Sequence, residues 1–137
     1  MIYVDDMDAP YQRGGRTLIM CHMFADTLEE MHQAATSIGL KLSYFQQPPK
    51  ASWPHYDIAR SKRKLLVDRG PDVVTEIPYG RQMLPYADKL TVEWMMRTGA
   101  PVPRSWLERR ITLTKDTSLL EHVRKLGVEV VEDVKCD

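Results

Sequence analysis

Residues 17–39 read TLIMCHMFADTLEEMHQAATSIG and contain a strand signal followed at once by a helix signal. The apolar run over 17–21, which follows two glycines, predicts a strand. Thr27 and Glu30 then form a T-x-x-E capping box, the pattern that begins a helix. Apolar residues recur at helical spacing after it, and Gly39 is well placed to end the helix. A strand that leads into an amphipathic helix is typical of an α/β fold.

The same alternation continues outward from this stretch. We expect further strands over 2–4, 40–45, 72–77, 110–114 and 128–134. We expect further helices from the N-cap Asp57 to Arg69, from about 86 to 98, and from Asp116 or Thr117 to Gly127. This order predicts one small α/β domain over residues 1–137, with a mainly parallel sheet and helices packed on it. The unusual polar motifs fall in residues 1–77, whereas 78–137 is plainer.

Composition limits the class of protein without naming an activity. The 19 Lys and Arg balance the 19 Asp and Glu, which argues against a polybasic coat for nucleic acid. No apolar run approaches the roughly 20 residues of a membrane helix, so we expect no membrane partner. The acidic start MIYVDDMDAP is unlike a signal peptide, and Cys21 and Cys136 lie far apart without a CxxC spacing. We therefore expect a reduced, cytoplasmic location.

Three polar clusters follow predicted strands or open a predicted helix. They are the pair Asp5 and Asp6, the single residue His22, and the trio His55-Tyr56-Asp57. Because ligands bind at the carboxyl ends of strands in open α/β sheets, we expect the clusters to share one edge. We predict catalytic roles for His55, Asp5, Asp6 and His22, with Asp26 and Asp57 as supporting residues.

Each cluster also has an ordinary structural interpretation. Two aspartates after a strand favour a turn, because their side chains bond to nearby backbone. A histidine between apolar residues, as at His22, is more often a core residue with one nitrogen satisfied. Asp57 is the natural N-cap of the helix expected to follow it. Both interpretations stay open for every cluster.

Basic residues suggest that the site recognises an anion. We predict substrate binding by Tyr56, Arg60, Ser61, Lys62 and Arg63, at the mouth of a helix. Arg13 and Arg16 join them, since the two glycines between them let backbone amides approach an anion. The alternatives are a solvated charged face and a plain hairpin turn. Carboxylate oxygens make a divalent metal compatible with the site, although the sequence names no closed ligand set.

The first 70 residues resemble a family of short uncharacterised proteins from bacteriophages and bacteria, which is described as a domain of unknown function. The resemblance is carried by Tyr3-Val4-Asp5-Asp6, His22, Ala25-Asp26-Thr27 with Glu30, Ile38-Gly39, Tyr44-Phe45-Gln46, Pro54-His55-Tyr56-Asp57 and Ser61-Lys62-Arg63. It implies a phage or prophage context, in which small proteins often modify nucleic-acid metabolism or disarm host defences. It implies no particular activity.

The most concrete hypothesis is a nucleotide- or phosphate-recognising protein that acts as a hydrolase on a nucleotide or a nucleic-acid end. One alternative is a non-catalytic protein that sequesters a nucleotide through the same residues. Another is an inhibitor of a host defence protein, with Trp94, Met95, Met96 or Trp106 as exposed anchors. A His55→Ala variant distinguishes the first two, because an enzyme would lose turnover while it still binds.

Overall fold

The long central strand β3 organises the fold. The computed structural model describes residues 1–132, which form a five-stranded sheet and a separate two-stranded sheet. Strand β3 (Arg16–Ala25) pairs with β2 (Ala9–Arg13), β1 (Ile2–Val4) and β4 (Tyr56–Ala59), and β1 pairs with β5 (Val74–Glu76). The small sheet joins β6 (Val102–Pro103) to β7 (Val130–Val131).

The large sheet is mostly antiparallel, so the expectation of a mainly parallel sheet is wrong, although the α/β class is confirmed. Strands β1, β2 and β4 all run antiparallel to β3, and β1 with β5 is the one parallel pair of this sheet within residues 1–132. Gly14 and Gly15 both have positive φ, 57° and 75°, and they turn the chain between β2 and β3. A two-residue turn joins antiparallel strands only. The hairpin-turn interpretation of 13–16 is therefore confirmed.

Three local expectations are also wrong. Residues 56–59 form the strand β4, because Tyr56 and Ile58 are buried and alternate with two less buried neighbours. The helix α2 (Arg60–Val67) starts after this strand, so Asp57 is not its N-cap. The segment 40–45 holds a short 3-10 helix, η1 (Leu42–Tyr44), in place of a strand. The segment 110–114 belongs to the helix α4 (Arg104–Thr114), whose Leu107 and Ile111, at helical spacing, pack in one apolar cluster.

The capping signals are confirmed where they are strongest. The helix α1 (Leu28–Ser37) starts at Thr27, whose hydroxyl accepts the Glu30 amide, and Gly39 follows its end with a positive φ of 83°. The helix α5 (Ser118–Leu126) begins after Thr117 and ends at Gly127. The helix α3 (Leu84–Thr98) follows a short 3-10 helix, η2 (Arg81–Met83). The sequence predicts a strand over 128–134. The strand β7 forms at Val130–Val131, and residues 133–134 lie outside the described residues.

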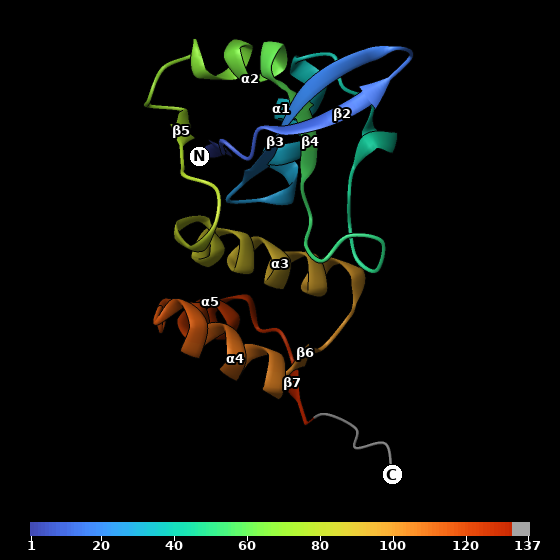
Figure 1. The fold of residues 1–137 in the computed structure, drawn as a ribbon. Coiled ribbons are helices and arrows are strands. Elements are labelled where there is room, and N and C mark those ends of the chain that lie inside the picture. Colours follow the sequence, from blue (N-terminus) through green and yellow to red (C-terminus); the bar gives the residue numbers. More distant parts are fainter. Residues whose placement is uncertain (133–137) are drawn as a thin grey trace.

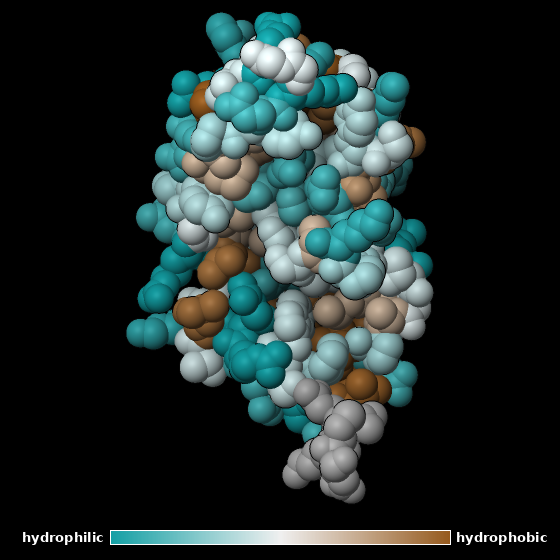
Figure 2. Space-filling view, turned by 45° about the vertical axis from the view of Figure 1, so that its right-hand side comes forward, coloured by the Kyte–Doolittle hydropathy of each residue, from teal (hydrophilic) through white to brown (hydrophobic). Residues whose placement is uncertain are grey.

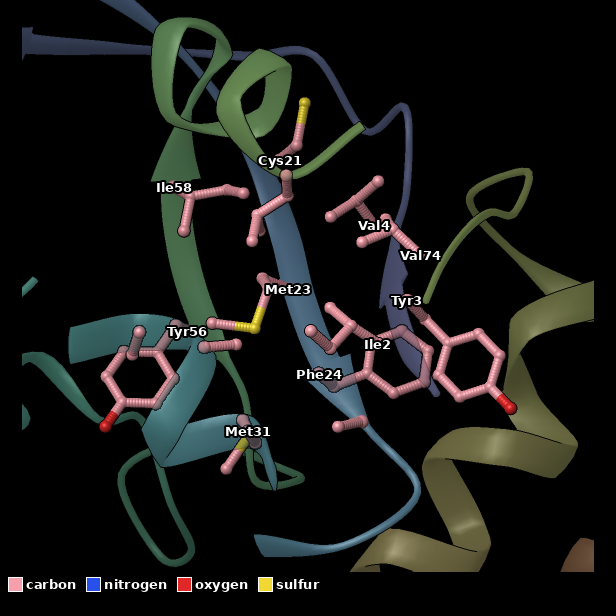
Figure 3. Close-up of a cluster of buried hydrophobic side chains, with 14 of the residues drawn as sticks. Ile2, Tyr3, Val4, Cys21, Met23, Phe24, Met31, Tyr56, Ile58 and Val74 are labelled. Carbon is pink, nitrogen blue, oxygen red and sulfur yellow. The ribbon is translucent and has the colours of Figure 1, made fainter. Parts of the chain in front are cut away.

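The helices divide the molecule into successive parts. Figure 1 shows α2 and the β2–β3 hairpin at one end, α3 across the middle, and α4 with α5 at the end nearest the C-terminus. One apolar cluster joins the large sheet to α1, α2 and the first half of α3; Figure 3 shows Met23, Tyr56 and Met31 close together there, with Tyr3 directed toward α3. A second cluster of Val92, Val102, Leu107, Leu119 and Val123 joins the rest of α3 to α4 and α5.

The surface carries scattered apolar side chains. On the face drawn in Figure 2, hydrophilic residues predominate, and the apolar ones form separate groups that are larger in the lower half. No helix within residues 1–132 has the length and apolar character needed to cross a membrane.

Candidate metal centre

The pairing of three strands places polar residues in one row across the large sheet. His22 on β3 lies directly opposite Asp57 on β4. Asp5, the residue after β1, donates its amide to the His22 carbonyl at 3.1 Å, which places it opposite His22 on the other side. His55 precedes Asp57 by two residues, and residues two apart in extended chain share a face. Four candidate site residues from separate parts of the sequence therefore meet on one face of the sheet.

His22 is held by the buried carboxylate of Asp5. The side chain of Asp5 has no exposed surface, and its Oδ2 lies 2.6 Å from His22 Nδ1. Its other oxygen, Oδ1, accepts the backbone amides of His22 at 2.8 Å and Met7 at 3.2 Å. An ionised carboxylate only accepts hydrogen bonds, so the ring proton of a neutral His22 lies on Nδ1 and the lone pair on Nε2.

His55 is held in the same tautomer by a backbone carbonyl. Its Nδ1 lies 2.9 Å from the Trp53 carbonyl oxygen, which only accepts, so Nδ1 donates and Nε2 carries the lone pair of the neutral ring. The indole of Trp53 stacks on the imidazole with centroids 4.4 Å apart. The two histidine rings lie edge to face with centroids 4.7 Å apart. Stacking and hydrogen bonding together fix the direction of His55 Nε2.

Three electron-pair donors therefore face one another. Asp57 Oδ1 lies 3.3 Å from His55 Nε2 and 3.8 Å from His22 Nε2, and ligand atoms of all three residues lie within 4.8 Å of one another. When a proton occupies His55 Nε2, its hydrogen bond lowers the pKa of the Asp57 carboxyl below its usual range, against the opposing effect of burial. Lone pairs on two imidazoles and a carboxylate repel one another unless a proton or a metal cation lies between them.

The donor set matches a divalent transition metal. Two histidines and one carboxylate are found in catalytic zinc sites and in non-haem iron sites, which keep open coordination positions. Each histidine has the outer partner that metal-binding histidines usually have, a carboxylate for His22 and a carbonyl for His55. The side chain of Asp57 is 39% exposed, whereas those of His22 and His55 are 12% and 8% exposed. Solvent would therefore approach beside Asp57.

A large cavity adjoins the two histidines. It has a volume of about 800 Å³ and is also lined by Trp53, Tyr79 and Arg81 and by residues of α3 and α4. The Tyr79 ring stacks on His22 with centroids 5.7 Å apart and planes 29° apart. The histidine pair thus forms part of the wall of a space large enough for a small ligand.

Asp57 belongs to a second hollow. This groove has a volume of about 700 Å³, and Arg13, Ser61 and Lys62, all predicted to bind substrate, line it together with Asp57. The two histidines line the cavity and Asp57 lines the groove, so the three donors lie between the two hollows. Each hollow has a basic side chain in its wall.

The other predicted site residues lie apart from the donors. Asp6 accepts the Tyr79 amide at 2.7 Å and so holds the loop before α3. Tyr56 is fully buried, and its hydroxyl lies 2.8 Å from His32 Nδ1. Arg16 lines a small hollow beside the hairpin turn, with Gly14 and Leu18.

The arginines of α2 are bound to carboxylates and backbone. Arg60 pairs with Asp8 at 3.0 Å. Arg63 pairs with Glu76 at 3.0 Å and donates from Nε to the Asp5 carbonyl at 2.8 Å. The structure thus separates the residues predicted to bind an anion: Arg13, Ser61 and Lys62 face the groove, whereas Arg63 supports the end of β1.

The prediction that Asp26 supports His22 is wrong. Strand β3 continues to Ala25, and four residues of extended chain span about 13 Å. Asp26 instead accepts the Tyr3 hydroxyl at 2.7 Å and pairs with the N-terminal amine at 3.3 Å. The partner of His22 is Asp5, which is distant from it in the sequence.

Sequence reasoning also missed Tyr79 beside the histidines and the residues of α3 and α4 that line the cavity, except Trp106, which it considered only as an anchor for a partner protein. The spacing His55-x-Asp57 indicates the pair of donors, because a strand places two residues with this spacing on one face. The pattern has this meaning only if the segment is a strand, and not if Asp57 begins a helix. Tyr79 and Arg110 come from loop and helix segments whose approach depends on tertiary packing, and no local pattern indicates them.

Fold and site together define a small α/β protein with a mixed sheet and a candidate centre of two histidines and one carboxylate. The model of the family described as protein of unknown function (DUF4031) matches residues 2–84, more than half of the chain's 137 residues. The chain belongs to this family. Asp5, His22, His55 and Asp57 all lie within the matched segment, whereas α4 and α5 lie beyond it. No curated protein and no solved structure matches the chain.

Proposed function

We propose that this protein is a metal-dependent hydrolase of phosphate esters, acting on a nucleotide or a nucleic-acid end, in which His22, His55 and Asp57 hold one divalent ion. The convergence of three lone-pair donors, each histidine fixed through its other nitrogen, is the observation that carries the proposal. A divalent ion at such a site lowers the pKa of bound water and polarises a phosphoryl oxygen.

The residues of the chain supply orientation and charge. Asp5 keeps the Nε2 lone pair of His22 directed at the site, and the Trp53 carbonyl does the same for His55. Asp57 is the most exposed of the three donors, so the attacking water would reach the centre at its side, whereas the cavity lined by the two histidines gives access to the ester. The stacked rings of Trp53 and Tyr79 limit the access of bulk water to the histidines.

Charge on both sides of the donors favours an anionic substrate. Arg81 lines the cavity and Lys62 lines the groove. Neither side chain has an ion-pair partner among residues 1–132. Cations that are not already neutralised by carboxylates are available to bind phosphate oxygens. A nucleotide substrate also fits the phage or prophage setting implied by the resemblance of the first 70 residues.

The test is metal content followed by turnover. The full chain, stripped with a chelator and reloaded with Zn²⁺, Mn²⁺ or Fe²⁺, is expected to bind one ion per chain and to hydrolyse bis(p-nitrophenyl) phosphate or a member of a nucleotide panel. The variants His22→Ala, His55→Ala and Asp57→Ala should lose both properties. His122→Ala is the matched control, because His122 lies on α5, outside the donor cluster.

Two results would contradict the proposal in different ways. A wild-type chain that binds less than stoichiometric metal, or whose histidine variants bind as well as the wild type, has no such centre. A metal-loaded chain that binds nucleotides tightly and never forms product is a sequestering protein, the alternative that uses the same residues.

A further inference from the structure

The cavity beside the histidines has walls from two parts of the chain. The wall that carries His22, His55, Trp53 and Tyr79 lies within the family match at 2–84. The rest of the lining comes mainly from α3 and α4 and includes Trp106, Arg110 and Leu113, all beyond the match. Figure 1 shows α4 next to α3 on the side away from the large sheet. A metal centre in the family segment is thus completed into a pocket by helices outside it.

The walls combine aromatic, apolar and cationic surface. Tyr79 is 55% exposed and Leu113 is 40% exposed, although both are large apolar side chains that line the cavity. Trp106 adds an indole to the lining. Exposed aromatic surface inside a cavity is typical of sites for planar ligands, because every base has a π-face that stacks on such rings.

Arg110 is fixed by a buried carboxylate. Its Nε lies 3.0 Å from both oxygens of Asp88, which is only 5% exposed. This pair uses Nε, so the two Nη groups of the guanidinium take no part in it. An arginine held in this way keeps a fixed direction, and Nη groups at the cavity wall can donate to an anionic oxygen.

Resting on the proposed function, we infer that the substrate is a mononucleotide, whose base lies against Trp106 and Leu113 of α4 while its phosphate reaches the metal centre beside Tyr79 and the histidines. A volume of about 800 Å³ is within the range of small-molecule sites and accommodates a nucleoside with its phosphate. The helices outside the family match therefore determine selectivity, whereas the matched segment supplies the chemistry.

Selectivity between a nucleotide and a base-free ester tests this inference. With metal-loaded full-length protein, kcat/KM is measured for a mononucleotide panel and for p-nitrophenyl phosphate. The ratio between the two is expected to favour a nucleotide in the wild type and to fall about tenfold in Trp106→Ala, the loss typical of one stacking contact. Trp94→Ala is the matched control, since Trp94 bonds Gln47 and does not line the cavity.

Leu113→Glu is a second test of the inference, which does not depend on whether Trp106→Ala folds. Leu113 is partly exposed, so the change should leave the fold intact while it places a negative charge beside the expected base and phosphate. Its selectivity ratio should also fall about tenfold. If Trp106→Ala and Leu113→Glu both keep the wild-type ratio, the inference is wrong even though the hydrolase proposal stands.

Binding separates the inference from the proposed function. The affinity of the metal-loaded chain for adenosine monophosphate and for ribose 5-phosphate is compared by calorimetry. Tighter binding of the nucleotide, lost in both cavity variants, supports the inference even if no substrate is hydrolysed. Equal affinity for the two ligands overturns it.

Discussion

Replacing Asp5 by asparagine is expected to weaken metal binding about 10- to 100-fold while the chain stays folded. Asp5 Oδ1 accepts two backbone amides, and Oδ2 faces His22 Nδ1. The carbonyl oxygen of asparagine can replace Oδ1 and keep both backbone bonds. Its NH₂ group then replaces Oδ2 and offers a donor where the carboxylate accepted.

The consequence for His22 is a change of tautomer. To accept from the new NH₂ group, Nδ1 must carry the lone pair, so the proton moves to Nε2, the nitrogen that faces Asp57. The change removes one charge-assisted hydrogen bond, about 1.5–3 kcal/mol, which corresponds to roughly 10- to 100-fold in affinity. Loss of the outer partner of a metal-binding histidine typically has an effect of this size.

Zinc affinity is measured by competition with a chromophoric chelator, and the tautomer of His22 is read from the ¹⁵N shifts of its ring nitrogens. Asp6→Asn is the matched control, because it removes the same charge one residue away and contacts Tyr79 in place of His22. Denaturant unfolding shows whether both variants are folded under the assay conditions. An Asp5→Asn chain that is folded and binds zinc within threefold of the wild type would refute the role assigned to Asp5.

Three further substitutions test the fold. Met23→Ala should lower the free energy of unfolding by about 2–5 kcal/mol in urea titrations, because the side chain is fully buried; a loss below 1 kcal/mol would contradict its place in the core. Thr27→Ala should cost about 1 kcal/mol by the same measurement, since the hydroxyl caps α1, and an unchanged midpoint would exclude that cap. Burial raises the pKa of the Glu93 carboxyl, so folding favours its protonated form, and its contribution to stability falls as pH rises. Glu93→Gln should therefore raise Tm at pH 7 by more than it does at pH 3. The exposed control Glu108→Gln should change Tm about equally at the two pH values. The same pH dependence of Tm in both variants would argue against the burial effect.

The sequence predicts the helix ends that are determined by residues within one helix turn. The capping box of Thr27 and Glu30, and the glycines that follow α1 and α5, act within one helix turn, so the ends of these helices could be predicted. Strand direction depends on contacts between distant segments. The alternation of segments suggested parallel crossovers, but the Gly14-Gly15 turn joins β2 and β3 as a hairpin and makes this part of the sheet antiparallel.

The candidate site shows the same division. The sequence indicated Asp5, His22, His55 and Asp57 as unusual polar residues but gave no partners for them. Nearness in sequence favours Asp26 as the partner of His22, whereas Asp5 holds it because β1 lies beside β3. The sequence predicts that Arg63 binds phosphate, whereas its position on α2 brings its guanidinium to the Asp5 carbonyl and Glu76.

The register between β3 and β4 connects the core to the candidate centre. Cys21 lies opposite Ile58 and Met23 opposite Tyr56, and all four are fully buried on one face of the sheet. A slip of one residue would move Tyr56 and Ile58 to the other face, away from Met23 and Cys21, so the apolar pairs strongly favour the observed register. That register also places His22 opposite Asp57 on the other face. The packing of the core therefore determines the geometry of the donors, which explains why the contacts of each donor could not be predicted before the strand pairing was known.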